Sequence, residues 1–75
     1  MITMQAVKSS TIRAIGYDGA DRTLRVEFNS GGLYNYKDVP RASYDALMAA
    51  ESVGRFFAAN IKPHFKFERV EKESA

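Results

Sequence analysis

The sequence contains no cysteine and a single histidine, His64. Without cysteine the chain can form neither a disulfide framework nor a thiolate metal site, which argues against a small secreted disulfide-rich protein. Glu68 follows His64 by four residues, but no second nitrogen or thiolate ligand accompanies them. A zinc site would therefore lack its usual set of ligands. We expect no metal site.

Long apolar runs and nucleotide-binding motifs are also missing. No apolar stretch approaches the roughly 18 residues of a membrane span, and residues 1–10 lack the basic and apolar regions of a signal peptide. Gly31-Gly32 is not followed by the Lys-Ser/Thr of a phosphate-binding loop. These absences predict a cytoplasmic protein with no membrane partner and no cofactor.

A convincing catalytic group is lacking as well. The run Ser9-Ser10-Thr11 offers hydroxyl nucleophiles, but only His64, near the other end of the chain, could act as their base. We expect these hydroxyls to form hydrogen bonds where the chain enters the fold. The sequence thus predicts a non-catalytic protein.

The length and composition point to one small domain. The 75 residues are 45% hydrophobic and 27% charged, a balance typical of a globular protein. A domain of this size buries only about 60% of the surface that its unfolded chain exposes, so its core is thin. Residues 1–6 and 71–75 show no clear periodicity. We therefore expect one domain over residues 7–70, between two frayed termini.

Positive charge is concentrated towards the C-terminus. The net charge is +2, and the pI is near 9.1. Within residues 53–70, four cations face Glu68 alone, a balance of +3, whereas residues 38–52 have one cation and three carboxylates, a balance of −2. A basic segment of this kind is typical of a phosphate-binding surface, and also of an ordinary solvated helical face.

The first half of the chain has the period of two that strands require. Leu24, Val26 and Phe28 alternate with charged residues, which predicts a strand with one buried and one solvated face. Residues 11–17 and 33–37 read as two further strands, separated from the first by turn-rich segments. The pattern predicts a three-stranded antiparallel meander.

The second half changes to the helical period of 3.6. Asp38 can cap, and Pro40 can begin, a helix that runs to about Ala50; Ser52 can cap a second short helix that ends before Pro63. Their apolar stripes consist of Tyr44, Leu47 and Met48, and of Val53, Phe56, Phe57 and Ile61.

The residues after Pro63 favour an extended end of the chain. Phe65 and Phe67 alternate with Lys66 and Glu68, which predicts an extended segment or a fourth strand. The expected fold is α+β: a three-stranded antiparallel meander covered on one face by two short helices, with a fourth C-terminal strand as an additional element.

A succession of residues along the chain resembles a known domain. The series is Ser10, Ile12, Ile15-Gly16-Tyr17-Asp18, Leu24-Arg25-Val26-Glu27-Phe28, Gly31, Tyr34-Asn35-Tyr36, Val39-Pro40, Leu47, Ser52, Gly54, Phe56-Phe57 and Ile61. Over residues 7–65 the chain resembles the KTSC domain, a module named for the C-terminus of some lysyl-tRNA synthetases that also occurs as a free-standing small bacterial or phage protein. The resemblance implies RNA binding as a suggested role and no established activity. It would lead us to expect Asn at position 58, where this chain has Ala58.

The pair Tyr34 and Tyr36 could stack nucleotide bases or fill the core. If the preceding hairpin loop has an even number of residues, Asn35 and Lys37 point towards the core. Burying an amide and an ammonium group without partners costs several kcal/mol. An odd loop avoids this cost because it turns Asn35 and Lys37 to the solvent.

An odd loop, for example Ser30-Gly31-Gly32 with Gly32 left-handed, pairs Phe28 with Tyr34 and Val26 with Tyr36. The two tyrosine rings then lie on the core side, while their hydroxyls can reach its edge. We therefore predict that the pair is mainly structural, with a surface platform for stacking bases as the alternative.

Aromatic and basic residues together provide a candidate nucleic-acid-binding set. Phe65 and Phe67 interleave with cations, as in proteins that bind single strands, although an edge strand with alternating faces gives the same pattern. The candidate contacts are Tyr34, Tyr36, Arg25, Lys37, Arg55, Lys62, Lys66 and Arg69.

These observations lead to two functional hypotheses. The first is a non-catalytic module that binds RNA, either tRNA or a single strand, through the basic and aromatic residues. The second is a protein-interaction or self-association module that uses an exposed sheet edge, since neither outer strand of the predicted meander contains proline.

Overall fold

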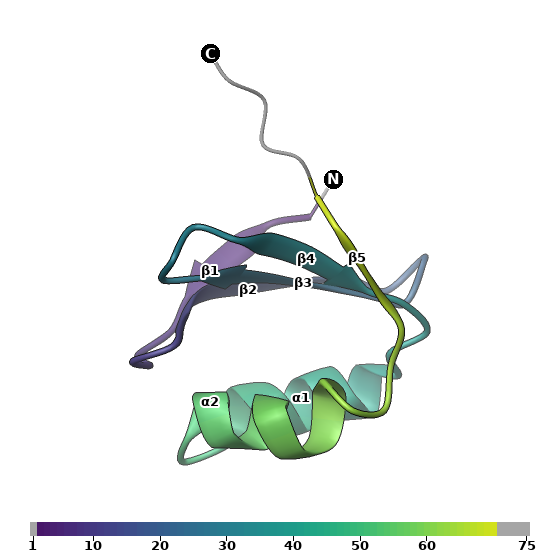
Figure 1. Ribbon diagram of the computed structural model, residues 1–75. Coiled ribbons are helices and arrows are strands. Elements are labelled where there is room, and N and C mark those ends of the chain that lie inside the picture. Colours follow the sequence, from purple (N-terminus) through teal and green to yellow (C-terminus); the bar gives the residue numbers. More distant parts are fainter. Residues whose placement is uncertain (1, 71–75) are drawn as a thin grey trace.

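A computed structural model describes residues 2–70 as one antiparallel sheet with helices on one of its faces (Figure 1). The five strands lie in sequence order, β1-β2-β3-β4-β5. The elements are β1 (Met4–Ala6), β2 (Ile12–Asp18), β3 (Thr23–Phe28), β4 (Leu33–Tyr36), α1 (Arg41–Ala49), α2 (Val53–Phe56), the π-helix η1 (Phe57–Ile61) and β5 (Phe67–Arg69). The α+β class and the helical cover on one face are as the sequence predicts.

The sheet is wider than the predicted meander. The C-terminal strand forms as β5 and pairs with β4, while β1 adds an outer strand next to β2. The sequence places the start of the domain at residue 7, yet β1 precedes it, because three residues are too few to establish a period of two. Residues 71–75, predicted to fray, lie outside the described residues.

The β3–β4 hairpin has an odd loop, but its register differs by two residues from the expected one. Val26 lies opposite Tyr34, not Tyr36. The loop closes because the Phe28 amide donates to the Gly32 carbonyl at 2.8 Å and the Gly31 amide donates to the Phe28 carbonyl at 2.9 Å. The left-handed position is Gly31, with φ +102°, rather than Gly32. The face of each side chain is unchanged, because a shift of two residues preserves the alternation.

Asp38 does not cap the first helix. Its φ is +57°, and α1 instead begins after Pro40, whose backbone is extended and provides no side-chain cap. Ser52 caps the second helix as predicted, since its Oγ accepts a hydrogen bond from the Arg55 amide at 3.4 Å.

The second helix widens along its length. α2 continues directly into η1, where the Lys62 amide donates to the Phe57 carbonyl five residues earlier, at 2.9 Å. The helical segment ends before Pro63. Hydrophobic periodicity does not distinguish so short a π-helix from an α-helix, and the sequence gives no sign of it.

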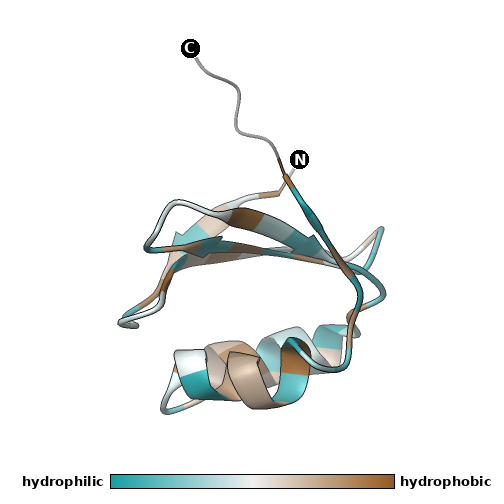
Figure 2. Cartoon of the chain, in the orientation of Figure 1, coloured by the Kyte–Doolittle hydropathy of each residue, from teal (hydrophilic) through white to brown (hydrophobic). Residues whose placement is uncertain are grey.

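The core lies between the sheet and the helices. Apolar and hydrophilic segments alternate along the strands, in keeping with one buried and one open face (Figure 2). The buried cluster is made of Ile12, Ile15, Leu24, Val26, Tyr36, Val39, Leu47, Val53, Phe57 and Ile61. This layer fixes β4 against the helical layer and so determines which side chains reach its rim. Within residues 2–70, no helix has the length and apolar character to cross a membrane.

Candidate nucleic-acid-binding groove

A groove of about 480 Å³ opens where the β3–β4 hairpin and β5 meet the end of η1. Its lining combines aromatic rings, a glycine-rich loop and two cations. The lining residues, which we call the aromatic groove, are Phe28, Ser30, Gly31, Gly32, Tyr34, Tyr36, Lys62, Phe67 and Arg69. The groove brings together four of the eight candidate contacts: Tyr34, Tyr36, Lys62 and Arg69.

Strand register assembles the aromatic wall. Tyr36 lies opposite Phe67 across the β4–β5 pair, and their ring centroids are 5.4 Å apart. Tyr34 meets Phe67 and Phe28 edge to face, at 5.5 Å in each case. Tyr36 also packs on Phe57, which connects the wall to the core. Edge-to-face pairs of this kind stabilise the arrangement of the rings.

The rings differ sharply in accessibility. Tyr36 is only 3% exposed, in agreement with a core position, and Tyr34 is half-buried. Among the large hydrophobic side chains of residues 2–70, Phe67 is the one that is exposed, at 55%. The tyrosine pair is thus split between core and groove, and Phe67 presents the open aromatic surface.

The glycine loop allows the groove to form. A Cβ added at Gly32 would lie 2.9 Å from Cε1 of Tyr34, so the tyrosine ring can rest on this backbone only because no side chain is present. A Cβ at Gly31 would meet nothing within 4 Å, which leaves open space beside the loop. Position 31 nevertheless favours glycine, because its φ is positive and glycine adopts such a φ without steric cost.

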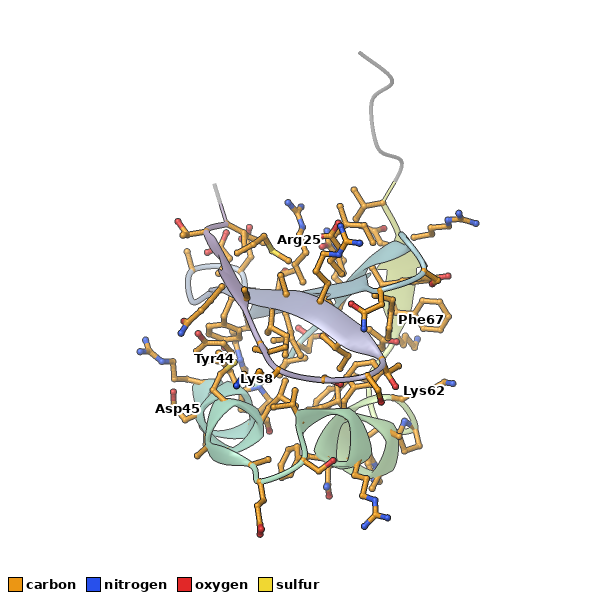
Figure 3. The ribbon with its side chains drawn as sticks, turned by 90° about the vertical axis from the view of Figure 1, so that its left-hand side faces the viewer. Lys8, Arg25, Tyr44, Asp45, Lys62 and Phe67 are labelled. Atoms are coloured by element: carbon orange, nitrogen blue, oxygen red, sulfur yellow. The ribbon has the colours of Figure 1, made fainter. Side chains whose placement is uncertain are left out.

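Two cations border the aromatic wall. Lys62 follows η1, and Arg69 lies on β5 opposite Tyr34. Lys62 and Phe67 project from the same side of the molecule (Figure 3). The ion pairs formed within residues 2–70 involve neither Lys62 nor Arg69. Their charges are therefore available to an anionic ligand.

Burial raises the pKa of Tyr36 above its ordinary value, and the nearby Tyr34 phenol raises it further. A tyrosine is already neutral at pH 7, and the raised pKa extends this neutral range to higher pH, so the ring adds no negative charge beside the two cations.

Arg25 and Lys37 lie on the open face of the sheet, away from the groove. Arg25 projects from the side of the sheet opposite the helices (Figure 3), and its Nε donates to Oδ1 of Asn35 at 2.8 Å. Lys37 Nζ lies 3.2 Å from Oε1 of Glu68. Both cations therefore have partners within the protein and are separated from the aromatic wall by the sheet.

Arg55 and Lys66 also lie outside the groove. Arg55 lines a separate cleft with Lys8 and the hydroxyl run of residues 9–11. Lys66 is exposed just before β5, where its carbonyl accepts a hydrogen bond from the Lys37 amide at 2.8 Å. Ala58 is exposed on η1, so the departure from the resemblance concerns the surface of this helix.

Sequence reasoning did not identify Phe28 as part of the groove. The available signal was its alternation with Val26, which places both residues on one face, but the end of the hairpin leaves Phe28 at the rim of the core. Within residues 2–70, no group of three or more metal-ligating side chains is present.

Comparisons with known proteins agree with this architecture. The family model of the KTSC domain matches residues 8–65. A protein from Tsukamurella paurometabola is 48% identical over 63 residues, which cover 84% of this chain and 94% of that protein. A lysine–tRNA ligase from Nostoc sp. is 38% identical over 63 residues, which cover 84% of this chain but only 11% of the ligase.

A solved structure shows the same fold. The crystal structure of a KTSC domain protein from Yersinia pestis aligns with a TM-score of 0.92 at 38% sequence identity, covering 95% of this chain and all of that one. The chain therefore belongs to the KTSC domain family.

Proposed function

We propose that this domain is a non-catalytic RNA-binding module and that its contact surface is the aromatic groove. One observation carries the proposal: the exposed ring of Phe67 lies in the same groove as Lys62 and Arg69. Proteins that bind single strands combine aromatic stacking surfaces with cations that follow the phosphates. The groove offers both in one place.

The distribution of charge supports this surface over the open face of the sheet. On the open face, Lys37 is paired with Glu68, and Arg25 is engaged by Asn35. In the groove, Lys62 and Arg69 have no ion-pair partner within the described part of the chain. A phosphate entering the groove therefore gains attraction without displacing an existing ion pair.

The relatives favour an RNA partner. Some of them are lysine–tRNA ligases, which by name act on tRNA, and the matching segment is a small part of each. A small module carried beside such an enzyme would suit a role in holding RNA. An RNA partner goes with a cytoplasmic location, which is part of this proposal.

The alternative, a protein-interaction module, would use a sheet edge. The outer strands β1 and β5 have three residues each, and β5 carries the charged Glu68 and Arg69. Short, charged edge strands discourage the addition of a further strand. Dimerisation that is insensitive to salt, measured by sedimentation at two salt concentrations, would favour this alternative.

Two double charge reversals test the proposal. Lys62→Glu with Arg69→Glu changes the groove, and Lys8→Glu with Arg55→Glu changes the separate cleft. Each pair lowers the net charge from +2 by four, to −2, so the variants are matched in overall charge. Circular dichroism establishes that both are folded.

Binding to fluorescein-labelled tRNA is measured by fluorescence anisotropy. The groove variant should lose affinity by about a hundredfold or more, because it removes two charge-assisted contacts that contribute on the order of 1.5 kcal/mol each. The cleft variant should lose much less. Equal losses in the two variants would contradict the assignment of the groove, and wild-type protein that binds no RNA would contradict the function itself.

A further inference from the structure

We infer that the aromatic groove takes one unpaired base at a time from a single strand, with the neighbouring phosphates at Lys62 and Arg69. This inference rests on the proposed function and makes it more specific, because RNA could also bind as a duplex through its phosphates alone. Three features of the groove favour a single strand: the exposed ring, the size of the stacking platform and the number of free cations.

The groove offers a ring surface, and only an unpaired base can use it. Phe67 is 55% exposed although its strand is packed against β4. A base within a duplex has both faces covered by its neighbours, whereas an unpaired base can be displaced from the strand and stacked on an aromatic side chain. The exposed Phe67 ring therefore selects against paired bases.

The platform has room for a single stacked base. Within residues 2–70, Phe67 is the exposed large hydrophobic residue, while Tyr36 is buried and Tyr34 is half-buried between Phe28 and Phe67. Gly31 lines the same groove, and a Cβ there would meet no atom within 4 Å, so the loop end of the groove is open. A strand whose base stacks on Phe67 therefore meets no side chain at Gly31.

The number of cations in the groove also suits contact with only a few nucleotides. Only Lys62 and Arg69 line the groove as cations, whereas Arg55 lies in another cleft. Recognition of duplex RNA through its backbone spans about 16 base pairs, which needs a longer series of contacts. Two phosphate contacts to a single strand predict a slope of about −1.4 in a plot of log K against log salt, at about 0.7 per phosphate.

Three RNA probes of about 16 nucleotides, the length that recognition of a duplex requires, carry the same fluorescent label and separate stacking from charge. They are a single-stranded oligouridylate, a strand of the same length in which every base is replaced by an abasic site, and a duplex. The oligouridylate should bind at least about fivefold more tightly than the abasic strand, the effect of losing one stacked base. It should also bind more tightly than the duplex.

Two groups of variants identify the contacts. Phe67→Leu keeps an apolar side chain but removes the ring, so it should weaken oligouridylate binding to the level of the abasic strand and leave abasic binding unchanged. Phe67→Trp should retain the preference. Arg69→Gln should weaken the binding of both single-stranded probes and reduce the magnitude of the salt slope by about 0.7. Arg55→Gln removes the same charge outside the groove, so it should change neither the affinities nor the slope.

The outcomes distinguish this inference from the proposed function. If the abasic strand and the duplex bind as tightly as oligouridylate, the single-base site is refuted while RNA binding through charge survives. If Phe67→Leu lowers the affinity for oligouridylate and for the abasic strand equally, the ring is not a stacking platform and the inference also fails. If none of these probes binds but tRNA does, the inference fails and the proposed function survives; if tRNA does not bind either, both fail.

Discussion

Replacing Tyr36 with alanine tests whether the wall of the groove is anchored in the core. Tyr36 is 3% exposed and packs on Phe57 and Phe67. Truncating a buried aromatic residue costs about 3–5 kcal/mol. A chain of this length is expected to have a free energy of unfolding of about 4–11 kcal/mol. Tyr36→Ala should therefore remove a large part of the stability.

Urea unfolding followed by circular dichroism measures the effect. With a slope near 1 kcal/mol per molar urea, typical of a small domain, a loss of about 3 kcal/mol lowers the midpoint by about 3 M. Tyr34→Ala should cost roughly half as much because its ring is half-buried. Tyr36→Phe, which keeps the ring, is the matched control and should shift the midpoint little. A midpoint within about 1 M of wild type for Tyr36→Ala, or a larger loss for Tyr34→Ala, would refute the packing argument.

Three further effects can be measured with the same assay. Gly31→Ala should destabilise by about 1–3 kcal/mol through its φ of +102° alone, since no atom lies near the new Cβ; Gly19→Ala is the control and should change little. Ser52→Ala should cost about 1 kcal/mol because it removes the oxygen that caps α2; an unchanged midpoint would contradict that role. Because the pKa of Tyr36 is raised in the folded state, the folded protein holds this proton more tightly than the unfolded chain. The contribution of the Tyr36 phenol to the free energy of unfolding should be fully present below about pH 10 and should be lost as the pH rises through the pKa of the folded state. Tyr36→Phe should therefore lose less stability at high pH than the wild type does.

The alternating strands and the side of each residue could be predicted from the sequence. The cost of burial is enough to predict that the β3–β4 loop has an odd number of residues, because an even number would bury Asn35 and Lys37. Parity does not fix register, however, and shifts of two residues leave the same side chains inside. The choice of Gly31 over Gly32 as the left-handed residue depends on the hydrogen bonds that close the loop, which two adjacent glycines do not reveal.

The groove could be predicted only in part. Tyr34, Tyr36, Lys62 and Arg69 were candidates, but they come from β4, the end of η1 and β5. Their meeting depends on the β4–β5 register, which sets Tyr34 opposite Arg69. A segment as short as β5 has too few residues to specify this pairing by its own pattern. For the same reason, β1 has no signal in the sequence.

An NMR titration with the oligouridylate probe tests the central claim most directly, because it reports where the strand binds. The side-chain signals of the Phe67 ring and Arg69 Nε report on the groove, and those of Arg25 Nε and the Asn35 amide report on the open face of the sheet. We expect the two groove signals to shift progressively with added RNA and the two open-face signals to stay in place. Larger shifts at Arg25 and Asn35 than at Phe67 and Arg69, or no shift at any of them, would contradict RNA binding in the groove.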